Sequence, residues 1–245
     1  MSGARCQGPG ASAFNREYAQ VAVFVRTIRM TLKNVFIAGG TGYIGQVLIP
    51  LLVERGHEVR ALVRPGSERK LPPGCGAVIG NALDGSSFSQ RVRPSDTFVQ
   101  LVGVPHPSPA KADQFQSIDL ASVRASVSAA TRGGVKHFVY VSVAQPAPVM
   151  KAYQAVRAEG EKIIRDSGLN ATILRPWYVL GPGHRWAYAL LPMYWLFEQV
   201  PGTRETARRL GLVTLDQMVG ALTKAVESPG DGVRIYDVSS IKQFQ

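Results

Sequence analysis

Residues 35–45 read VFIAGGTGYIG, an apolar run that passes directly into a glycine-rich turn. Glycines at 39, 42 and 45 form a GxxGxxG pattern, in which the first permits a tight turn, the second lets backbone approach a phosphate, and the third lets a helix pack on the strand. An apolar-periodic helix follows, and its N-terminus offers backbone N–H groups and a positive dipole end to an anion. A strand before the turn and a helix after it predict a dinucleotide-binding turn made of Gly39, Thr41, Gly42, Tyr43, Ile44 and Gly45.

Apolar runs of strand length alternate with helix-length segments from residue 34 onward. This alternation, with right-handed crossovers, predicts an α/β fold with a doubly wound parallel sheet of the Rossmann type. The expected strands are 35–38, 58–63, 76–79, 97–102, 137–142, 171–174 and 233–238, and the expected helices are 43–54, 86–93, 111–131, 152–166 and 215–226. Asp84 and Asp216, at the starts of helical stretches, are expected N-caps. We predict a single domain over residues 31–245, with a small C-terminal lobe of substrate-side elements at 176–212.

The composition is that of a folded domain with a basic surface. Of its 245 residues, 45% are hydrophobic and 18% charged, which is enough apolar surface for one core. The net charge of +11 could attract nucleic acid, anionic lipid or a phosphorylated ligand. Because the basic residues are scattered, without a long basic run or a recognisable nucleic-acid module, we expect no nucleic-acid partner.

Cysteine and histidine are sparse and dispersed. Neither Cys6 nor Cys75 lies in a CxxC motif or a Cys/His cluster. His106 and His137 lack carboxylate or cysteine partners at metal-ligand spacing, and His57 is expected on the surface of a turn. The sequence therefore predicts no metal site, and reduced thiols in a cytoplasmic protein.

Residues 1–30 differ in composition from the rest of the chain. They contain four Arg and one Glu, and their apolar stretch, Val21–Val25, is too short for a signal-peptide core or a membrane span. Because Met30 stands just before the first expected strand, we interpret it as the natural start and the preceding residues as a flexible extension. An Arg-rich, transit-like segment is the alternative interpretation.

The residue after the second expected strand indicates which dinucleotide is preferred. That strand ends at Val63, and Arg64 follows where an NAD site usually carries Asp or Glu toward the adenosine ribose. A guanidinium can bind a 2′-phosphate through paired, charge-assisted hydrogen bonds, whereas a carboxylate would repel it. Ser67, Arg69 and Lys70 follow closely as further donors. Arg64 therefore predicts a preference for NADP(H), with NAD(H) still possible; a solvated surface arginine is the alternative.

Four more segments accompany the turn: GNALD at 80–84, HFVYVSV at 137–143, the helix of Tyr153, and LRPWYVLGPG at 174–183. With them the chain resembles the atypical short-chain dehydrogenase/reductase superfamily, in particular NmrA-like and extended NAD(P)-binding Rossmann proteins and the Rossmann-type accessory subunit of respiratory complex I. The resemblance covers roughly residues 32–238. It implies further cofactor contacts at Asn81, Ala82, Leu101, Val102, Gly103, Ser142, Tyr153, Arg157 and Pro176.

The resemblance also implies a catalytic group, and here the chain departs from the family. Relatives pair a proton-donating Tyr with a Lys four residues later, whereas this chain has Tyr153 and Arg157. The spacing keeps a cation on the same helix face as the phenol, but Arg is bulkier, planar and permanently charged. The family's second serine is also missing, since Val143 follows Ser142. Tyr153, Arg157 and Ser142 remain the expected catalytic residues; a half-buried Tyr and a solvated Arg without chemistry are the alternative.

These observations predict an NADP(H)-dependent oxidoreductase that acts on a small or medium apolar carbonyl-type substrate. A non-catalytic NADP(H)-binding module, regulatory or redox-sensing, is the second hypothesis. An NAD-dependent epimerase or dehydratase is the third and conflicts with Arg64.

An aromatic segment follows the sixth expected strand. Residues 184–197 read HRWAYALLPMYWLF, which fits a wall of an apolar substrate pocket, plain core, a dimer contact or a weak membrane-surface contact. It is too short to span a bilayer, and Pro192 would break a helix through it. We expect a small-molecule substrate as the partner, no transmembrane segment, and a monomer or homodimer.

Overall fold

The computed structural model describes residues 32–182 and 204–244. The interpretation of residues 1–30 as an extension and that of the aromatic segment 184–197 lie outside these residues, as does part of the expected lobe at 176–212.

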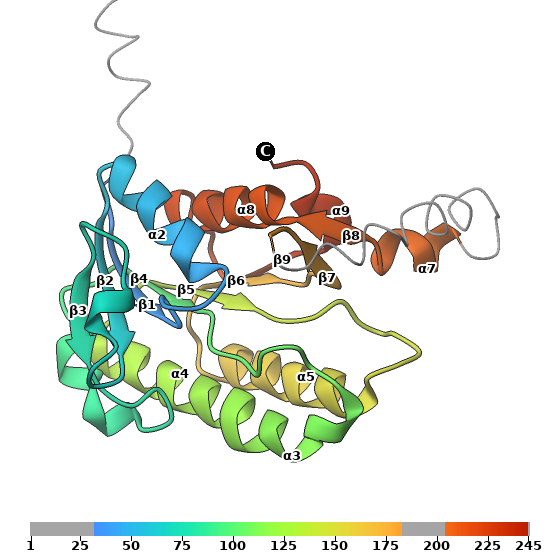
Figure 1. Cartoon of the computed structure of the whole chain (residues 1–245), viewed down its shortest axis with the longest axis horizontal. Helices are drawn as coiled ribbons and strands as arrows, with labels where there is room; N and C mark the ends of the chain where they lie inside the picture. The colour runs from blue at the N-terminus through green and yellow to red at the C-terminus, as the bar shows by residue number, and fades with distance from the viewer. Residues whose placement is uncertain (1–31, 183–203, 245) are drawn as a thin grey trace, which may run out of the picture. The chain divides into compact units, whose positions relative to one another are not determined.

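Seven parallel strands form the sheet at the centre of the fold (Figure 1). Their order across the sheet is β3-β2-β1-β4-β5-β6-β9, in which the chain runs outward from β1 in one direction and then from β4 in the other. The strands are β1 (Asn34–Ala38), β2 (Glu58–Val63), β3 (Gly76–Ile79), β4 (Thr97–Gln100), β5 (His137–Val141), β6 (Ala171–Leu174) and β9 (Val233–Tyr236). The predicted Rossmann-type α/β fold is confirmed. Its order places a switch point between β1 and β4, where such folds bind ligands.

Helices cover both faces of this sheet (Figure 1). On one face lie α2 (Gly45–Glu54), α8 (Leu215–Glu227) and α9 (Val238–Ile241), and on the other lie α4 (Ala121–Gly133) and α5 (Lys151–Asp166). The inner strands β1, β4, β5 and β6 are buried almost throughout because each side of the sheet faces a helix layer. Two separate groups of buried side chains result: Ile37 and Leu222 belong to the first, Phe36 and Phe138 to the second.

A pair of short strands stands apart from the main sheet. β7 (Tyr178–Leu180) pairs in parallel with β8 (Leu212–Thr214), and α7 (Arg204–Arg209) precedes β8. The sequence analysis predicted neither strand, because three residues are too few for a recognisable period.

The helix expected over 111–131 is not continuous. It comprises a 3₁₀ turn (Pro109–Lys111), the short α3 (Ala112–Gln114), a π-helical turn (Phe115–Leu120) and then α4. The expected helix 86–93 is likewise wrong, since two 3₁₀ turns, Gly85–Ser87 and Ser89–Arg91, take its place. Side-chain periodicity does not distinguish these narrower or wider turns from an α-helix.

Two expectations about single residues are wrong. The cap of α8 is Thr214, not Asp216: the Thr214 side chain accepts from the Gln217 amide and the Gln217 side chain accepts from the Thr214 amide. His57 is buried rather than exposed, and its Nδ1 accepts a hydrogen bond from the Lys33 amide at 3.2 Å. Asp84 does cap a helical element, the 3₁₀ turn Gly85–Ser87, where its side chain accepts from the Ser86 amide.

A buried histidine on β5 makes the fold sensitive to acid. The His137 ring is buried with its Nε2 3.0 Å from Thr172 Oγ1, and burial, with Arg234 and Lys33 nearby, lowers its pKa from 6.5 to about 4. A pKa that is lower in the folded than in the unfolded chain costs stability as the pH falls from about 6.5 toward about 4. We expect the His137 term to remove about 2.5 kcal/mol of unfolding free energy between pH 7 and pH 4.5.

Urea unfolding at the two pH values measures this loss. His137→Asn should show a shallower pH dependence of stability than the wild type. His106 is exposed, so His106→Asn should keep the pH dependence of the wild type. Equal slopes for the wild type and His137→Asn would rule out the buried neutral imidazole as the cause.

Candidate functional site

The glycine turn joins β1 to α2 in a backbone form that side chains disfavour. Gly39 has a φ of +92°, and a Cβ there would lie 2.9 Å from the backbone of both Leu101 and Val102, just beyond β4. Such a φ is uncommon for residues other than glycine. Both features require glycine at position 39, and both bring the turn against the chain that leaves the neighbouring strand.

The other two glycines differ in what surrounds them. A Cβ at Gly45 would lie 2.6 Å from the Gly40 carbonyl oxygen, so the first turn of α2 packs directly on the turn before it. A Cβ at Gly42 would meet only the Gly39 carbonyl oxygen, at 3.2 Å, and Gly42 otherwise faces open space. That space lies at the N-terminus of α2, where backbone N–H groups without intrahelical partners favour an anion.

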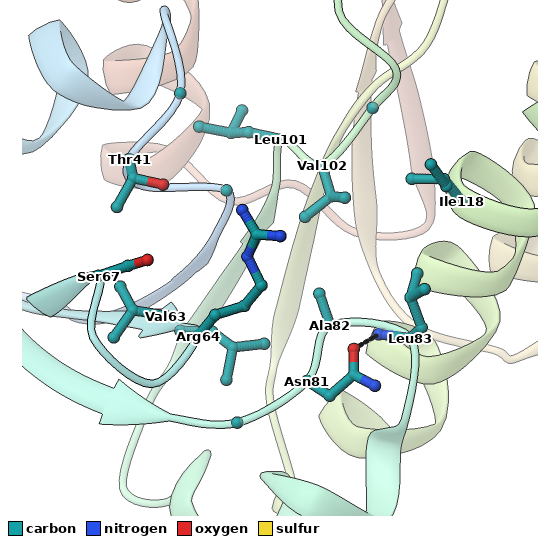
Figure 2. A pocket seen from close by; sticks show the side chains of 15 residues that line it. Thr41, Val63, Arg64, Ser67, Asn81, Ala82, Leu83, Leu101, Val102 and Ile118 are labelled. Atoms are coloured by element: carbon teal, nitrogen blue, oxygen red, sulfur yellow. Dashed lines mark hydrogen bonds between the residues drawn. The ribbon is translucent and has the colours of Figure 1, made fainter. Parts of the chain in front are cut away.

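A cavity of about 380 Å³ opens beside this turn (Figure 2). Nine of the sequence-predicted cofactor residues line it: Gly39, Thr41, Gly42, Arg64, Asn81, Ala82, Leu101, Val102 and Gly103. Tyr43, Ile44, Gly45, Ser142, Tyr153, Arg157 and Pro176 are not among its lining residues. Ser67, expected as a further donor beside Arg64, also lines the cavity, and five lining residues were not predicted: Leu62, Val63, Gly80, Leu83 and Ile118.

Arg64 reaches into the cavity from the end of β2. Figure 2 shows its guanidinium directed between the glycine turn and the segment of Leu101 and Val102. Among the described residues it has no ion-pair partner, so its charge is available to a ligand. The Ser67 hydroxyl lies on the same side (Figure 2).

The far end of the cavity is apolar. Ala82, Leu83, Val102 and Ile118 line it, and the Asn81 side chain is held there because its Oδ1 accepts from the Leu83 amide at 3.0 Å (Figure 2). In this Asx turn the side-chain oxygen of Asn81 is already occupied by a hydrogen bond. Small apolar walls around a gap of this kind suit a flat aromatic base.

Ser142 lies at the end of β5 and is bound to a buried carboxylate. It is 3% exposed, and its hydroxyl donates to Glu161 Oε1 at 2.7 Å. Arg175, Arg165 and Gln145 also donate to Glu161. Burial raises the pKa of Glu161, but these hydrogen bonds and the Arg175 charge outweigh it, so the pKa falls below its usual value. The Ser142 hydrogen is therefore engaged within the protein.

Arg157 is also buried, and its partner is Asp119. The side chain of Arg157 is 6% exposed and that of Asp119 is fully buried, and the two form an ion pair through Nη2 and Oδ1. Nη1 donates to the Val141 carbonyl at 3.0 Å. Burial alone would lower the pKa of Arg157, but its aromatic and acidic neighbours raise it, so the guanidinium stays charged. The sequence analysis did not identify Asp119, because the contact spans 38 residues.

Tyr153 is half-buried and lies beside this pair. The Arg157 Cζ stands 5.0 Å from the centroid of its ring, and the Phe115 ring is 4.9 Å away on centroids. The expected proximity of a cation to Tyr153 is therefore present, although the cation lies over the ring. Pro176 follows β6, and its carbonyl accepts from the Ala144 amide at 2.9 Å.

Within residues 32–182 and 204–244, no cluster of three His, Cys, Asp or Glu has the arrangement of a metal site. Cys75 is a free thiol whose pKa burial raises to about 11. In the same part of the chain, every helix is too short or too polar to cross a bilayer.

The family model for NAD(P)H-binding proteins matches residues 39–189, which is more than half of the chain. The chain belongs to the NAD(P)H-binding family. The residues fit such a cofactor on structural grounds as well. The turn has no side chain at Gly42, and the cavity joins a helix N-terminus, an apolar end and a guanidinium that has no ion-pair partner among the described residues. The predicted NAD(P)-binding Rossmann protein is confirmed, whereas its NADP preference and NmrA-like type stay predictions.

Curated relatives of this NAD(P)H-binding chain include two bacterial proteins. A 3-beta-hydroxysteroid dehydrogenase of Mycolicibacterium neoaurum is 30% identical over 122 residues, which is 47% of this chain and 33% of the relative. An uncharacterized sugar epimerase, YhfK, of Bacillus subtilis (strain 168) is 29% identical over 154 residues, 58% of this chain and 71% of the relative. The chain thus spans only a third of the length of the first relative.

Solved structures share the fold. The Bordetella bronchiseptica enzyme WbmH in complex with NAD+ superposes with a TM-score of 0.63 at 21% identity, covering 84% of this chain and 75% of that one. At that identity the likeness concerns the fold alone.

Proposed function

We propose that this protein is an NADP(H)-dependent oxidoreductase acting on a small or medium apolar carbonyl compound. The observation that carries the cofactor preference is the Arg64 guanidinium, which is directed into the cavity from the end of β2 without an acidic partner among the described residues. A 2′-phosphate at this place would gain charge-assisted hydrogen bonds.

The substrate class is supported by the surroundings of Tyr153. Val104, Phe115, Met150 and Val156 form an apolar group around it. A relative named as a 3-beta-hydroxysteroid dehydrogenase acts on an apolar molecule, which agrees with such surroundings. A sugar epimerase relative favours the third hypothesis, but an NAD-preferring site would gain nothing from Arg64.

In this proposal the bound dinucleotide supplies the hydride, and the chain supplies position and a proton. Tyr153 donates its phenolic proton to the substrate oxygen as general acid. The Arg157 guanidinium stands over the ring, with its Cζ 5.0 Å from the centroid, and helps to hold the phenol in place. Ser142, whose hydrogen goes to Glu161, acts here as a support for the end of β5 rather than as a donor to substrate.

A second candidate is a non-catalytic NADP(H)-binding module, and the contacts of Arg157 and Ser142 favour it. Both the cation and the hydroxyl that the family's chemistry would use are bound by buried carboxylates, Asp119 and Glu161. A module of this kind would bind NADPH tightly, and its conformation would differ between bound NADPH and bound NADP, but it would not turn over a substrate.

The two candidates separate in one assay. The full chain is mixed with NADPH and a set of apolar ketones, quinones and enones, and NADPH oxidation is followed at its absorbance band. The oxidoreductase proposal expects turnover with at least one compound, and Tyr153→Phe should reduce kcat by about 100-fold or more while NADPH still binds. Tyr236→Phe, on β9 and outside the lining of the cavity, is the matched control for loss of a phenol. NADPH binding without turnover on any compound would favour the binding module.

A further inference from the structure

One π-helical turn connects the cofactor cavity to the helix of Tyr153. Along the turn Phe115–Leu120, Phe115 packs against the Tyr153 ring, Ile118 lines the cavity, and Asp119 pairs with Arg157. A π-turn is rare and tends to occur at functional sites inside α-helices. A single turn of the chain thus contacts the Tyr153 ring, the cofactor cavity and Arg157.

The Asp119 carboxylate has two partners, on different sides. Its Oδ1 accepts from Arg157 on α5, and its Oδ2 accepts from the Val104 amide at 3.2 Å, just after the lining residue Gly103. Burial raises the pKa of Asp119 and the Arg157 charge opposes that shift. The carboxylate therefore ties the chain that leaves β4 to the helix that carries Tyr153.

Arg157 completes this connection from its own side. A Cβ at Gly103 would lie 2.5 Å from Arg157 Nη2, so the cavity wall and the guanidinium are in direct contact. Its other terminal nitrogen binds the Val141 carbonyl, and its Cζ lies over the Tyr153 ring. At 6% exposure, the side chain is enclosed by protein instead of reaching outward to a ligand.

We propose that Asp119 and Arg157 are a pair of positioning residues, in which Asp119 holds the guanidinium under Gly103 so that the cavity wall and the Tyr153 ring are fixed relative to each other. Arg157 then acts through Gly103 and Tyr153, not as a direct ligand of the cofactor ribose. The part of this inference that concerns Tyr153 rests on the proposed function, and the part that concerns the cavity wall does not.

The test is a double-mutant cycle on the full chain with two readouts. Asp119→Asn, Arg157→Met and the double variant are compared for NADPH affinity by calorimetry and for hydrogen exchange of the Val104 amide. If the pair acts as a unit, each single variant raises the NADPH Kd by about tenfold and the double variant by no more than that. Exchange at Val104 should accelerate in all three, because its acceptor is lost or released.

The matched control is the ion pair between Arg124 on α4 and Glu159 on α5. It carries the same charges at 3.7 Å but is exposed on both sides, so Arg124→Met and Glu159→Gln should change neither readout. Arg157→Lys keeps the charge beside Asp119 and should stay within about threefold of the wild-type Kd. Circular dichroism checks that each variant is folded.

Two results on NADPH affinity would overturn the proposal. One is a rise in Kd in Arg157→Met with none in Asp119→Asn, which would make Arg157 a direct cofactor ligand. The other is multiplicative losses in the double variant, which would make the two residues independent. If the wild type binds no nicotinamide dinucleotide, the proposed function fails, and unchanged exchange at Val104 would still reject the positioning role by itself.

Discussion

Replacing Gly39 by alanine is expected to lower the free energy of unfolding by about 3 kcal/mol and to abolish measurable NADPH binding. Two costs add at this position. The backbone φ of +92° is one that an alanine adopts only with strain, and the new Cβ would lie 2.9 Å from the backbone of Leu101 and Val102. A side-chain rotation cannot relieve either contact, because both are with main-chain atoms of the segment that follows β4.

Gly42→Ala separates the two roles of the turn. Its Cβ would meet only the Gly39 carbonyl oxygen at 3.2 Å, so the fold should lose much less than with Gly39→Ala, while the methyl group enters the cavity where a diphosphate would lie. Gly230→Ala, whose Cβ meets only the Arg234 side chain at 3.5 Å, is the neutral control. Urea unfolding and calorimetry with NADPH measure both effects. Equal loss of stability in Gly39→Ala and Gly230→Ala would contradict the strain argument.

The sheet was predictable because each of its strands corresponds to a short apolar run that is separate from the others in the sequence. The bounds of β2, β3 and β6 agree with the sequence prediction to the residue, and β1, β4, β5 and β9 differ by one or two residues at an end. Runs buried on both faces between turn residues are the strongest local signal in a parallel sheet. The π-helical turn and the pair β7–β8 were missed because their shapes depend on packing, which no local period reports.

The cofactor half of the site was predictable for a related reason. The glycine turn, Arg64 and the residues after β3 and β4 are adjacent to strand ends, and strand ends of a parallel sheet converge on one edge. A sequence motif plus the strand order is then enough to place nine lining residues together.

The catalytic half was not predictable to the same degree. Whether Ser142 and Arg157 are available depends on Glu161 and Asp119, which lie 19 and 38 residues away from them in sequence. In sequence, Glu161 resembles any polar residue of the amphipathic helix α5, and Asp119 resembles any polar residue of the helical stretch before α4. Their burial beside a cation or a hydroxyl is decided by how α4 and α5 pack, so one sequence alone carries no signal for it.

Replacing Arg64 by alanine is expected to raise the Kd for NADPH by about 30-fold, or about 2 kcal/mol, and to change the Kd for NADH by less than about twofold. The reason is that a guanidinium directed into the cavity would bind a 2′-phosphate, which only NADPH carries. The wild type should accordingly bind NADPH more tightly than NADH. Parallel calorimetric titrations of both proteins with both dinucleotides give the four constants that the comparison needs.

The sequence analysis offered Arg69 as a further donor, but Arg69 is exposed and does not line the cavity, so Arg69→Ala is the matched control. It removes the same charge from the same side of the fold, so a general electrostatic attraction would weaken NADPH binding equally in both variants. A loss confined to Arg64→Ala and to NADPH requires direct contact with the 2′-phosphate. If Arg64→Ala instead weakens NADH as much as NADPH, the guanidinium contacts the diphosphate that both share, and a wild type that favours NADH would refute the NADP preference itself.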